Sequence, residues 1–338
     1  MNLMQRYNVA ILGCGAIFSR HLAAIKANAA NFNLIGLYDP NSELLHNYSK
    51  ELNVVAYNSQ EEIYNDSRVD CVILLTPSNL HFTQALAALH HGKNLIIEKP
   101  ASFLSHQINE LEQEALLRGL HIFTILQVRL NKAFRVAKQF IAAGHMGNMR
   151  GVSLIQRWQR PVDYFCGWRG SMVSGGGILR EFGIHYLDIM QQLAGNPKVT
   201  AASFFKTKIK ATDVSDTVYA LLDFGEFGGS CEISMAAEPR NLECSLTLLS
   251  DRGIIKLGGK SLDEIVCADF LECRLLDYLE QAKEQVANED KDTVFAAVGG
   301  ASPYHPELYR QIIINPQRFA LGQTYAIVKL IEEIYAYE

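Results

Sequence analysis

Residues 8–18, Asn8-Val-Ala-Ile-Leu-Gly13-Cys-Gly15-Ala-Ile-Phe18, decide the fold of the first third of the chain. Val9 to Leu12 is a short apolar run without alternation, which is typical of a strand buried on both faces. It leads directly into a pair of glycines. The first glycine permits a tight turn, and the second lets backbone N–H groups approach a pyrophosphate at the start of a helix. Phe18 replaces the third glycine of the usual G-x-G-x-x-G pattern, which weakens the match.

Strands and helices continue to alternate up to about residue 125. Apolar runs at 34–38, 71–75, 94–97 and 121–125 predict four more buried strands, with amphipathic segments between them. Short connections between alternating strands and helices indicate a doubly wound parallel sheet. We therefore expect residues 1–125 to form an α/β Rossmann domain that binds a dinucleotide.

The pattern changes in the second half of the chain, which we expect to form a second domain over residues 126–338. Consecutive strand-like segments joined by tight turns predict an α+β domain with a large, mostly antiparallel, open sheet. These segments are 151–159, 199–207, 217–224, 229–236, 246–249 and 254–257. A last helix near 323–337 carries one apolar stripe, and the sequence leaves open whether it packs back on the first domain.

Composition sets limits on the class of protein. With 338 residues, 49% of them hydrophobic, and a net charge of −5, the chain is long enough for two cores and offers no basic surface for nucleic acid or an anionic membrane. It has no apolar stretch of about 18 residues that could span a membrane. Seven cysteines without a C-x-x-C pair argue against disulfides and zinc fingers and favour a reducing compartment. We expect a cytoplasmic protein.

Polar residues follow the predicted strands at the edge where dinucleotides bind. Asp39 ends the second strand, where a carboxylate accepts hydrogen bonds from an adenosine ribose and repels a 2′-phosphate. This favours NAD over NADP, although Asp39 is alternatively a turn residue before Pro40. Thr76 and Pro77 follow the next strand and are candidates to line the cofactor pocket. His81 is predicted equally well to pack or to cap a helix.

Two segments contain candidates for catalysis. In Glu98-Lys99-Pro100, proline keeps the lysine in an extended conformation at the tip of a buried strand, where partial desolvation makes its charge useful. The alternative is a solvated loop lysine. In the second segment, a helix starting at Ile178 places Glu181, His185 and Asp188 on one face, which suits acid–base work by the histidine. A purely structural role and binding of a divalent metal are the alternatives.

These motifs together resemble those of the glucose–fructose oxidoreductase/inositol dehydrogenase/MocA family. The resemblance rests on the Gly-x-Gly turn, on Glu-Lys-Pro, and on the run from Gly175-Gly-Gly177 through Glu181-Phe-Gly-Ile-His185 to Asp188. It implies an NAD(P)-dependent dehydrogenase acting on sugar or cyclitol hydroxyls, with Lys99 and His185 as the catalytic pair. It also implies a homodimer or homotetramer formed through the open sheet. Glu181 stands where the family usually has Asp, a departure that lengthens the side chain at this position.

On the motifs and this resemblance we assign the site residues. Catalysis is assigned to Lys99, His185, Asp188 and Glu181, and no metal is expected. Cofactor binding is assigned to Gly13, Gly15, Ala16, Ile17, Asp39, Thr76, Pro77, His81, Glu98, Lys99 and Gln127. Substrate binding is assigned to Arg129, Arg157, Trp158, Arg160, Tyr164, Trp168, Arg169 and His185.

The arginines and aromatic rings of 157–169 suit a substrate with phosphate or carboxylate groups and a stacking base or sugar. An interface loop has the same composition. Together with residues 127–129 and 305–309, the segment 157–169 resembles the family branch that includes UDP-N-acetylglucosaminuronate 3-dehydrogenases. The alternatives are an inositol or simple-sugar dehydrogenase, an NAD-dependent glycosidase of the same family, and a non-catalytic regulator that senses the dinucleotide. A regulator need not keep both Lys99 and His185.

Overall fold

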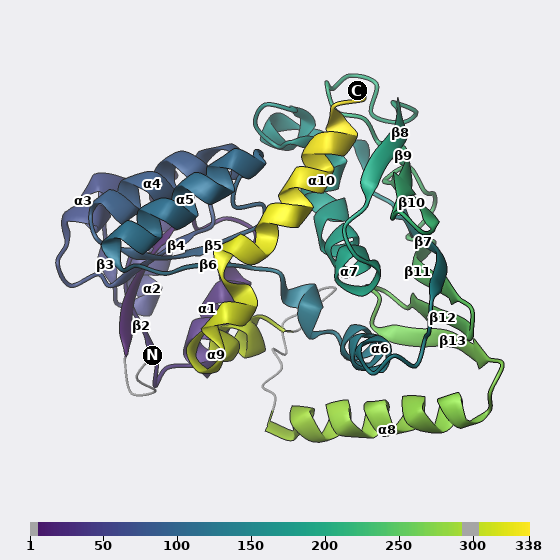
Figure 1. Ribbon diagram of the computed structural model, residues 1–338. Coiled ribbons are helices and arrows are strands. Elements are labelled where there is room, and N and C mark those ends of the chain that lie inside the picture. The colour runs from purple at the N-terminus through teal and green to yellow at the C-terminus, as the bar shows by residue number, and fades with distance from the viewer. Residues whose placement is uncertain (1–5, 293–303) are drawn as a thin grey trace. The chain divides into compact units, whose positions relative to one another are not determined.

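The computed structural model describes residues 6–292 and 304–338 (Figure 1). Contacts group these residues into two compact units. The first contains the residues up to 126 together with 304–325, and the second contains 127–292 together with 326–338. The sequence predicts two consecutive domains divided after residue 125, whereas in the structure the chain returns to the first unit near its end.

A parallel sheet of six strands forms the centre of the first unit, in the order β3-β2-β1-β4-β5-β6. This order, with a crossover from β3 back to β4 beside β1, is that of a Rossmann fold and confirms the predicted doubly wound sheet. The edge strand β3 has two exposed residues and no apolar run, so no sequence pattern predicts it. The strands are β1 Tyr7–Leu12, β2 Phe32–Tyr38, β3 Val55–Ala56, β4 Cys71–Leu74, β5 Asn94–Ile97 and β6 Ile122–Thr124.

Helices cover both faces of this sheet. Helices α4 and α5 pack together on one face, and α1 and α9 pack together on the other (Figure 1). The helix α9 comes from the end of the chain and buries Tyr309 completely. The helices of this unit are α1 Phe18–Ala27, α2 Ser42–Leu52, α3 Gln60–Asn65, α4 His81–His90, α5 Ser105–Arg118 and α9 His305–Ile314.

The second unit contains a seven-stranded sheet in the order β13-β12-β11-β7-β10-β9-β8. Neighbouring strands are antiparallel except β7 and β10, which are parallel, so the predicted mostly antiparallel sheet is confirmed. The strands are β7 Met149–Arg157, β8 Lys198–Phe205, β9 Thr217–Asp223, β10 Gly228–Ser234, β11 Glu243–Ser250, β12 Gly253–Gly258 and β13 Glu264–Phe270.

Four helices belong to this unit: α6 Lys132–Ala142, α7 Ile184–Ala194, α8 Arg274–Glu289 and α10 Tyr325–Tyr335. The apolar stripe of α10, formed by Ile327, Leu330, Ile331 and Ile334, is buried in the core of the second unit. The Tyr335 hydroxyl accepts a hydrogen bond of 3.1 Å from the Leu179 N–H. The last helix therefore packs within the second unit.

One face of the seven-stranded sheet is open (Figure 1). Tyr219 and Leu221 alternate with buried residues along β9 and are 45% and 57% exposed. Alternation of this kind turns every second side chain of a strand away from the core. None of the helices formed by the described residues is long and apolar enough to cross a membrane.

Candidate active site

The turn between β1 and α1 has the shape that a dinucleotide requires. Gly13 has a φ of +100°, and a Cβ at this position would lie 2.8 Å from the Leu75 carbonyl oxygen. Gly15 has no atom within 4 Å of the position a Cβ would occupy. The first glycine is therefore required by a close approach to the chain after β4, and the second leaves open space for a ligand at the start of α1.

Asp39 at the end of β2 is tied to this turn. Its Oδ2 accepts a hydrogen bond of 2.7 Å from the Cys14 N–H, and its Oδ1 accepts one of 2.8 Å from the Asn41 N–H. The carboxylate thus performs the turn role that was its alternative interpretation. It is half-buried at the edge where Gly15 and Ala16 are exposed, and its contact with a ribose stays a prediction.

His81 connects the ends of two strands. Its Nε2 lies 2.9 Å from the Thr76 carbonyl oxygen after β4, and its Nδ1 lies 2.8 Å from the Pro100 carbonyl oxygen after β5. The ring is 1% exposed, and burial lowers the pKa of the imidazole. Of the two roles considered for His81, the structure shows packing. Thr76 and Pro77 are half-buried at the same edge.

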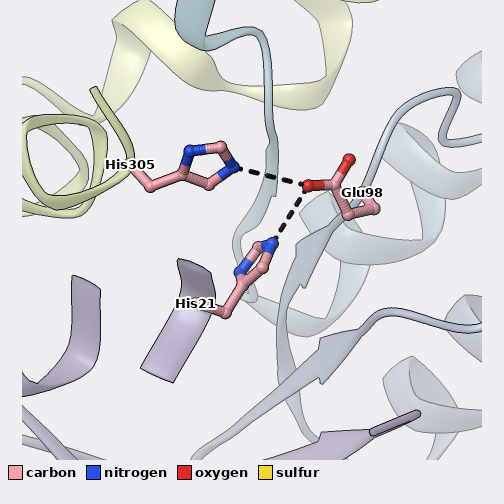
Figure 2. A group of neighbouring side chains, drawn as sticks. All are labelled: His21, Glu98 and His305. Atoms are coloured by element: carbon pink, nitrogen blue, oxygen red, sulfur yellow. Dashed lines mark hydrogen bonds and ion pairs between the residues drawn. The ribbon is translucent and has the colours of Figure 1, made fainter. Parts of the chain in front are cut away.

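Lys99 follows β5 and is half-buried. The side chain of its neighbour Glu98 turns inward: Oε2 accepts the Lys99 backbone N–H at 3.1 Å, and Oε1 lies 3.0 Å from Nε2 of His21 on α1. His305, the first residue of α9, points its Nε2 at the same oxygen from 3.8 Å (Figure 2). Both oxygens of the Glu98 carboxylate therefore contact groups of the protein, next to Lys99.

The glycine triplet of the second unit is required by close packing. A Cβ at Gly175 would lie 2.7 Å from the Trp168 carbonyl oxygen, and one at Gly177 would lie 2.3 Å from the Tyr335 hydroxyl. The close approach at these glycines is therefore between parts of the chain itself.

The segment after the triplet is not a regular α-helix from Ile178. Leu179–Gly183 forms a π-helical turn, and α7 begins only at Ile184. The predicted spacing of Glu181, His185 and Asp188 assumes a regular α-helix, and the π-turn interrupts that helix between Glu181 and His185. That the three side chains share one face stays a prediction. His185 and Asp188 both lie in α7, one turn apart.

The two carboxylates of this segment have different partners. Asp188 accepts two hydrogen bonds from Arg129, 2.7 Å from Nε and 2.6 Å from Nη2, and both side chains are buried. Glu181 accepts a hydrogen bond of 2.7 Å from the Tyr164 hydroxyl and lies 3.6 Å from Arg169 Nε. Arg129, assigned to the substrate, is thus held by Asp188. Gln127 lies beside it in the short 3-10 helix Gln127–Leu130 and is buried.

The aromatic rings and arginines of 158–169 gather around Glu181. The Arg160 guanidinium carbon lies 4.9 Å from the centroids of both Trp158 and Phe182. That of Arg169 lies 4.9 Å from Tyr164 and 4.5 Å from Trp168. We call Trp158, Arg160, Tyr164, Trp168, Arg169, Glu181 and Phe182 the aromatic–arginine cluster.

Arg157 does not join this cluster. It donates hydrogen bonds of 2.6 Å to both carboxylate oxygens of Glu232 on β10 and lies 3.4 Å from Glu243 on β11. Lys99 belongs to the first unit and His185 to the second. Their cooperation at one substrate stays a prediction.

Sequence reasoning missed three residues that surround the predicted lysine site: His21, His305 and Tyr309. The segment 305–309 contributes to the resemblance to the nucleotide-sugar branch, but none of its side chains is assigned a role there. No local pattern indicates that its side chains pack against α1, more than 270 residues earlier (Asn28 and Pro306 are 278 apart).

Comparison with known proteins identifies the family. Residues 7–125 match the model of an oxidoreductase family with an NAD-binding Rossmann fold, and residues 134–256 match the GFO/IDH/MocA C-terminal domain. The chain belongs to the GFO/IDH/MocA family of oxidoreductases. Its first unit is the NAD-binding Rossmann fold of that family, and the Gly13–Gly15 turn fits the cofactor because it leaves the open space that a pyrophosphate needs.

Relatives with assigned activities are distant. Scyllo-inositol 2-dehydrogenase (NADP(+)) IolW of Bacillus subtilis (strain 168) is 28% identical over 50% of this chain. The trans-1,2-dihydrobenzene-1,2-diol dehydrogenase of Macaca fascicularis is 27% identical over 55% of this chain. The matched parts cover 48% and 55% of those two proteins, so the chain spans about half the length of the curated relatives it matches.

Among solved structures, two WlbA dehydrogenases in complex with NADH and UDP-GlcNAcA have the same fold over nearly the whole chain. The one from Bordetella pertussis has a TM-score of 0.86 at 23% identity and covers 98% of this chain and 95% of its own. The one from Chromobacterium violaceum has a TM-score of 0.86 at 24% identity and covers 98% and 94%. An inositol dehydrogenase homolog from Azotobacter vinelandii has a TM-score of 0.80 at 17% identity and covers 99% and 96%.

Proposed function

We propose that this protein is an NAD-dependent dehydrogenase that oxidises a ring hydroxyl, at C3, of a nucleotide-activated sugar acid such as UDP-N-acetylglucosaminuronate. The aromatic–arginine cluster is the observation that carries this proposal. Two guanidinium groups lie among four aromatic rings, so cations and stacking surfaces occur together. Such a combination suits a substrate with a diphosphate, a carboxylate and a base.

The fold comparison adds support of a different kind. The two WlbA structures were solved with NADH and UDP-GlcNAcA, and their fold covers 98% of this chain. An inositol or other polyol substrate is the second candidate, because IolW, the B. subtilis relative, is a scyllo-inositol dehydrogenase. An uncharged polyol makes little use of two arginines, and we therefore prefer the nucleotide sugar.

The chemistry follows from the assigned residues. Bound NAD supplies the hydride acceptor for the carbon that carries the hydroxyl. His185 accepts the hydroxyl proton, and its position in α7 one turn from Asp188 lets a carboxylate orient the imidazole. Lys99 stabilises the developing alkoxide with its positive charge. Arg129 fixes the orientation of the Asp188 side chain, because both carboxylate oxygens accept hydrogen bonds from it.

The cofactor preference and the assembly are part of the proposal. Asp39 at the end of β2 places a negative charge where a 2′-phosphate would lie, so NAD is preferred to NADP. The open face of the seven-stranded sheet, with exposed Tyr219 and Leu221, suits a homodimer or homotetramer.

A melting-temperature screen tests the proposal. A ligand at a hundredfold excess over its Kd stabilises the folded protein by about 2.7 kcal/mol. We expect NAD, UDP and UDP-N-acetylglucosaminuronate each to raise the melting temperature, and NADP and the inositols to have little effect. Turnover is then followed as NADH absorbance with the stabilising sugar. Stabilisation by scyllo-inositol and none by UDP would contradict the nucleotide-sugar assignment. Sugar release without net NADH would indicate a glycosidase.

A further inference from the structure

Four buried side chains of the first unit form a connected group next to Lys99. The Tyr309 hydroxyl lies 2.7 Å from His21 Nδ1, and His21 Nε2 lies 3.0 Å from Glu98 Oε1. His305 Nε2 points at the same oxygen from 3.8 Å (Figure 2). His21 and Tyr309 are fully buried, and His305 is 2% exposed. Water therefore has little access to these contacts, and the hydrogen-bonding groups must find their partners within the protein.

The charges in this group fix its hydrogen bonds. Burial opposes the charge of Glu98, but the hydrogen bond from His21 and the nearby His305 imidazole outweigh it and hold the pKa of the carboxyl well below its ordinary value. Burial lowers the pKa of His21, so its imidazole is neutral. A neutral ring beside a carboxylate carries its proton on the nitrogen that faces the carboxylate. His21 thus donates from Nε2 to Glu98, and its Nδ1 accepts from the Tyr309 hydroxyl.

The carboxylate at the end of this chain is bound to the backbone of the lysine. Glu98 Oε2 accepts the Lys99 N–H at 3.1 Å while Oε1 is held by His21. On the other side of Lys99, the Pro100 carbonyl oxygen lies 2.8 Å from His81 Nδ1. The backbone on both sides of Lys99 is therefore fixed by buried side chains.

Two members of the group come from the end of the chain. Helix α9, which contains His305 and Tyr309, packs along α1, and the Asn28 side-chain amide donates a hydrogen bond of 2.9 Å to the Pro306 carbonyl oxygen. The Tyr309 ring also lies edge-on to Phe32, with centroids 5.2 Å apart. Because α9 is held at several points, it can hold His21 in turn.

We propose that Tyr309 and His305 are positioning residues: acting through His21 and Glu98, they fix the backbone from which the Lys99 side chain extends. This inference depends on the proposed function, because it takes Lys99 to be the group that contacts the substrate. A carboxylate held at both oxygens does not rotate, so the Lys99 N–H has one orientation. Loss of the Tyr309 hydroxyl leaves His21 Nδ1 buried without a hydrogen-bond partner, so the ring loses one of the two contacts that orient it toward Glu98.

The first test compares Tyr309→Phe with Tyr57→Phe. Tyr57 is a matched control because it is 4% exposed, lies in the same unit, and donates an equally short hydrogen bond of 2.7 Å to Asp66. Loss of one buried hydrogen bond corresponds to about a tenfold effect. We expect Tyr309→Phe to lower kcat about tenfold with little change in the KM for NAD, and Tyr57→Phe to leave both constants unchanged.

The second test reads Lys99 directly and does not depend on the substrate. Reductive methylation with ¹³C-formaldehyde gives each lysine an NMR signal, and Lys99→Arg identifies that of Lys99. We expect this signal to shift in Tyr309→Phe and in His305→Gln, and to stay in place in Tyr57→Phe. Absence of turnover with every sugar tested would overturn the proposed function. An unshifted Lys99 signal in folded Tyr309→Phe would overturn the positioning role.

A metal ion offers a different explanation for the same residues, since the ligand atoms of His21, Glu98 and His305 lie within 4.8 Å of one another. Elemental analysis of the purified protein separates the two. We expect no stoichiometric divalent ion. An equivalent of zinc that is lost in His305→Gln would mean that metal coordination, rather than hydrogen bonding, holds the group, and the positioning proposal would be wrong.

Discussion

Arg129 and Asp188 form a buried, bidentate ion pair within the second unit, with hydrogen bonds of 2.7 and 2.6 Å. Their side chains are 6% and 4% exposed, so neither charge is compensated by water. Asp188 lies one helical turn from His185 in α7. The pair therefore links the short helix at 127–130 to the segment that contains the proposed base.

Removing one member of this pair should damage stability more than removing both. In Arg129→Met the buried Asp188 carboxylate loses its partner, which costs about 3–5 kcal/mol. In the double variant Arg129→Met/Asp188→Leu, no charge remains unpaired. We expect urea unfolding to give a large loss for the single variant and a smaller loss for the double. A substrate-binding Arg129 would instead raise the KM for the sugar in Arg129→Lys at unchanged stability.

Lys99 and His185 should each be needed for turnover and dispensable for cofactor binding. Loss of a charged group that stabilises the transition state in a dry site costs about 10²–10³ in rate. We expect Lys99→Met and His185→Ala to lower kcat by about that factor, with the Kd for NAD within about threefold of wild type, which is a change of less than 1 kcal/mol. Near-normal turnover of either variant on the true substrate would remove that residue from the mechanism.

The local parts of this architecture could be predicted from sequence, and the parts that depend on distant segments could not. The turn at Gly13 and Gly15 is encoded by adjacent residues, and the parallel sheet by repeated short apolar runs. The contact between His21 and Tyr309 joins residues 288 apart, and that between His21 and Glu98 joins residues 77 apart. The periodicity of the sequence around these residues does not indicate which distant side chains they contact.

The second unit shows a different limit. Its sequence predicts a helix after the glycine triplet, but the π-turn at Leu179–Gly183 depends on packing around it, including the contact of Leu179 with Tyr335. For the same reason the roles of the arginines could not be separated in advance. Arg157 and Arg160 are three residues apart, yet Arg157 binds Glu232 and Arg160 stacks on Trp158.

Arg160 should contribute to binding of the nucleotide sugar. A hydrogen bond to a charged group is worth about 1.5–3 kcal/mol, so Arg160→Gln should raise the KM for the sugar roughly 10- to 100-fold and leave NAD binding unchanged. Arg150→Gln removes an exposed arginine from β7 in the same unit and is the matched control. Equal KM values for the two variants would argue that the aromatic–arginine cluster is a subunit contact.

The open sheet should be a contact between copies of the chain. Leu221 is 57% exposed on β9, and a lysine there would place a charge in a buried apolar interface. We expect light scattering to show that Leu221→Lys dissociates the oligomer. Leu116→Lys, at a leucine of α5 that is 82% exposed, should leave the mass unchanged. A wild-type protein that is already monomeric would exclude this assembly.

Acid should destabilise the first unit through His21, whose folded pKa is lowered by burial despite the bond to Glu98. His305, Tyr309 and Arg20 are the other charged or titratable groups around it. Above about pH 6.5 the imidazole is neutral in both states. Below that pH the unfolded chain binds a proton that the folded chain does not, so stability falls by up to about 1.4 kcal/mol per pH unit for this group.

The measurement compares urea unfolding between pH 7 and 5 for wild type, His21→Gln and His46→Gln. His46 is exposed on α2, so its removal should leave the slope of stability against pH unchanged. His21→Gln cannot take up the proton, and its slope should be shallower by close to one proton's contribution. The same slope in His21→Gln as in wild type would mean that His21 is already protonated in the folded protein. In that case both nitrogens would be donors, and the Tyr309 hydroxyl would accept a hydrogen bond rather than donate one.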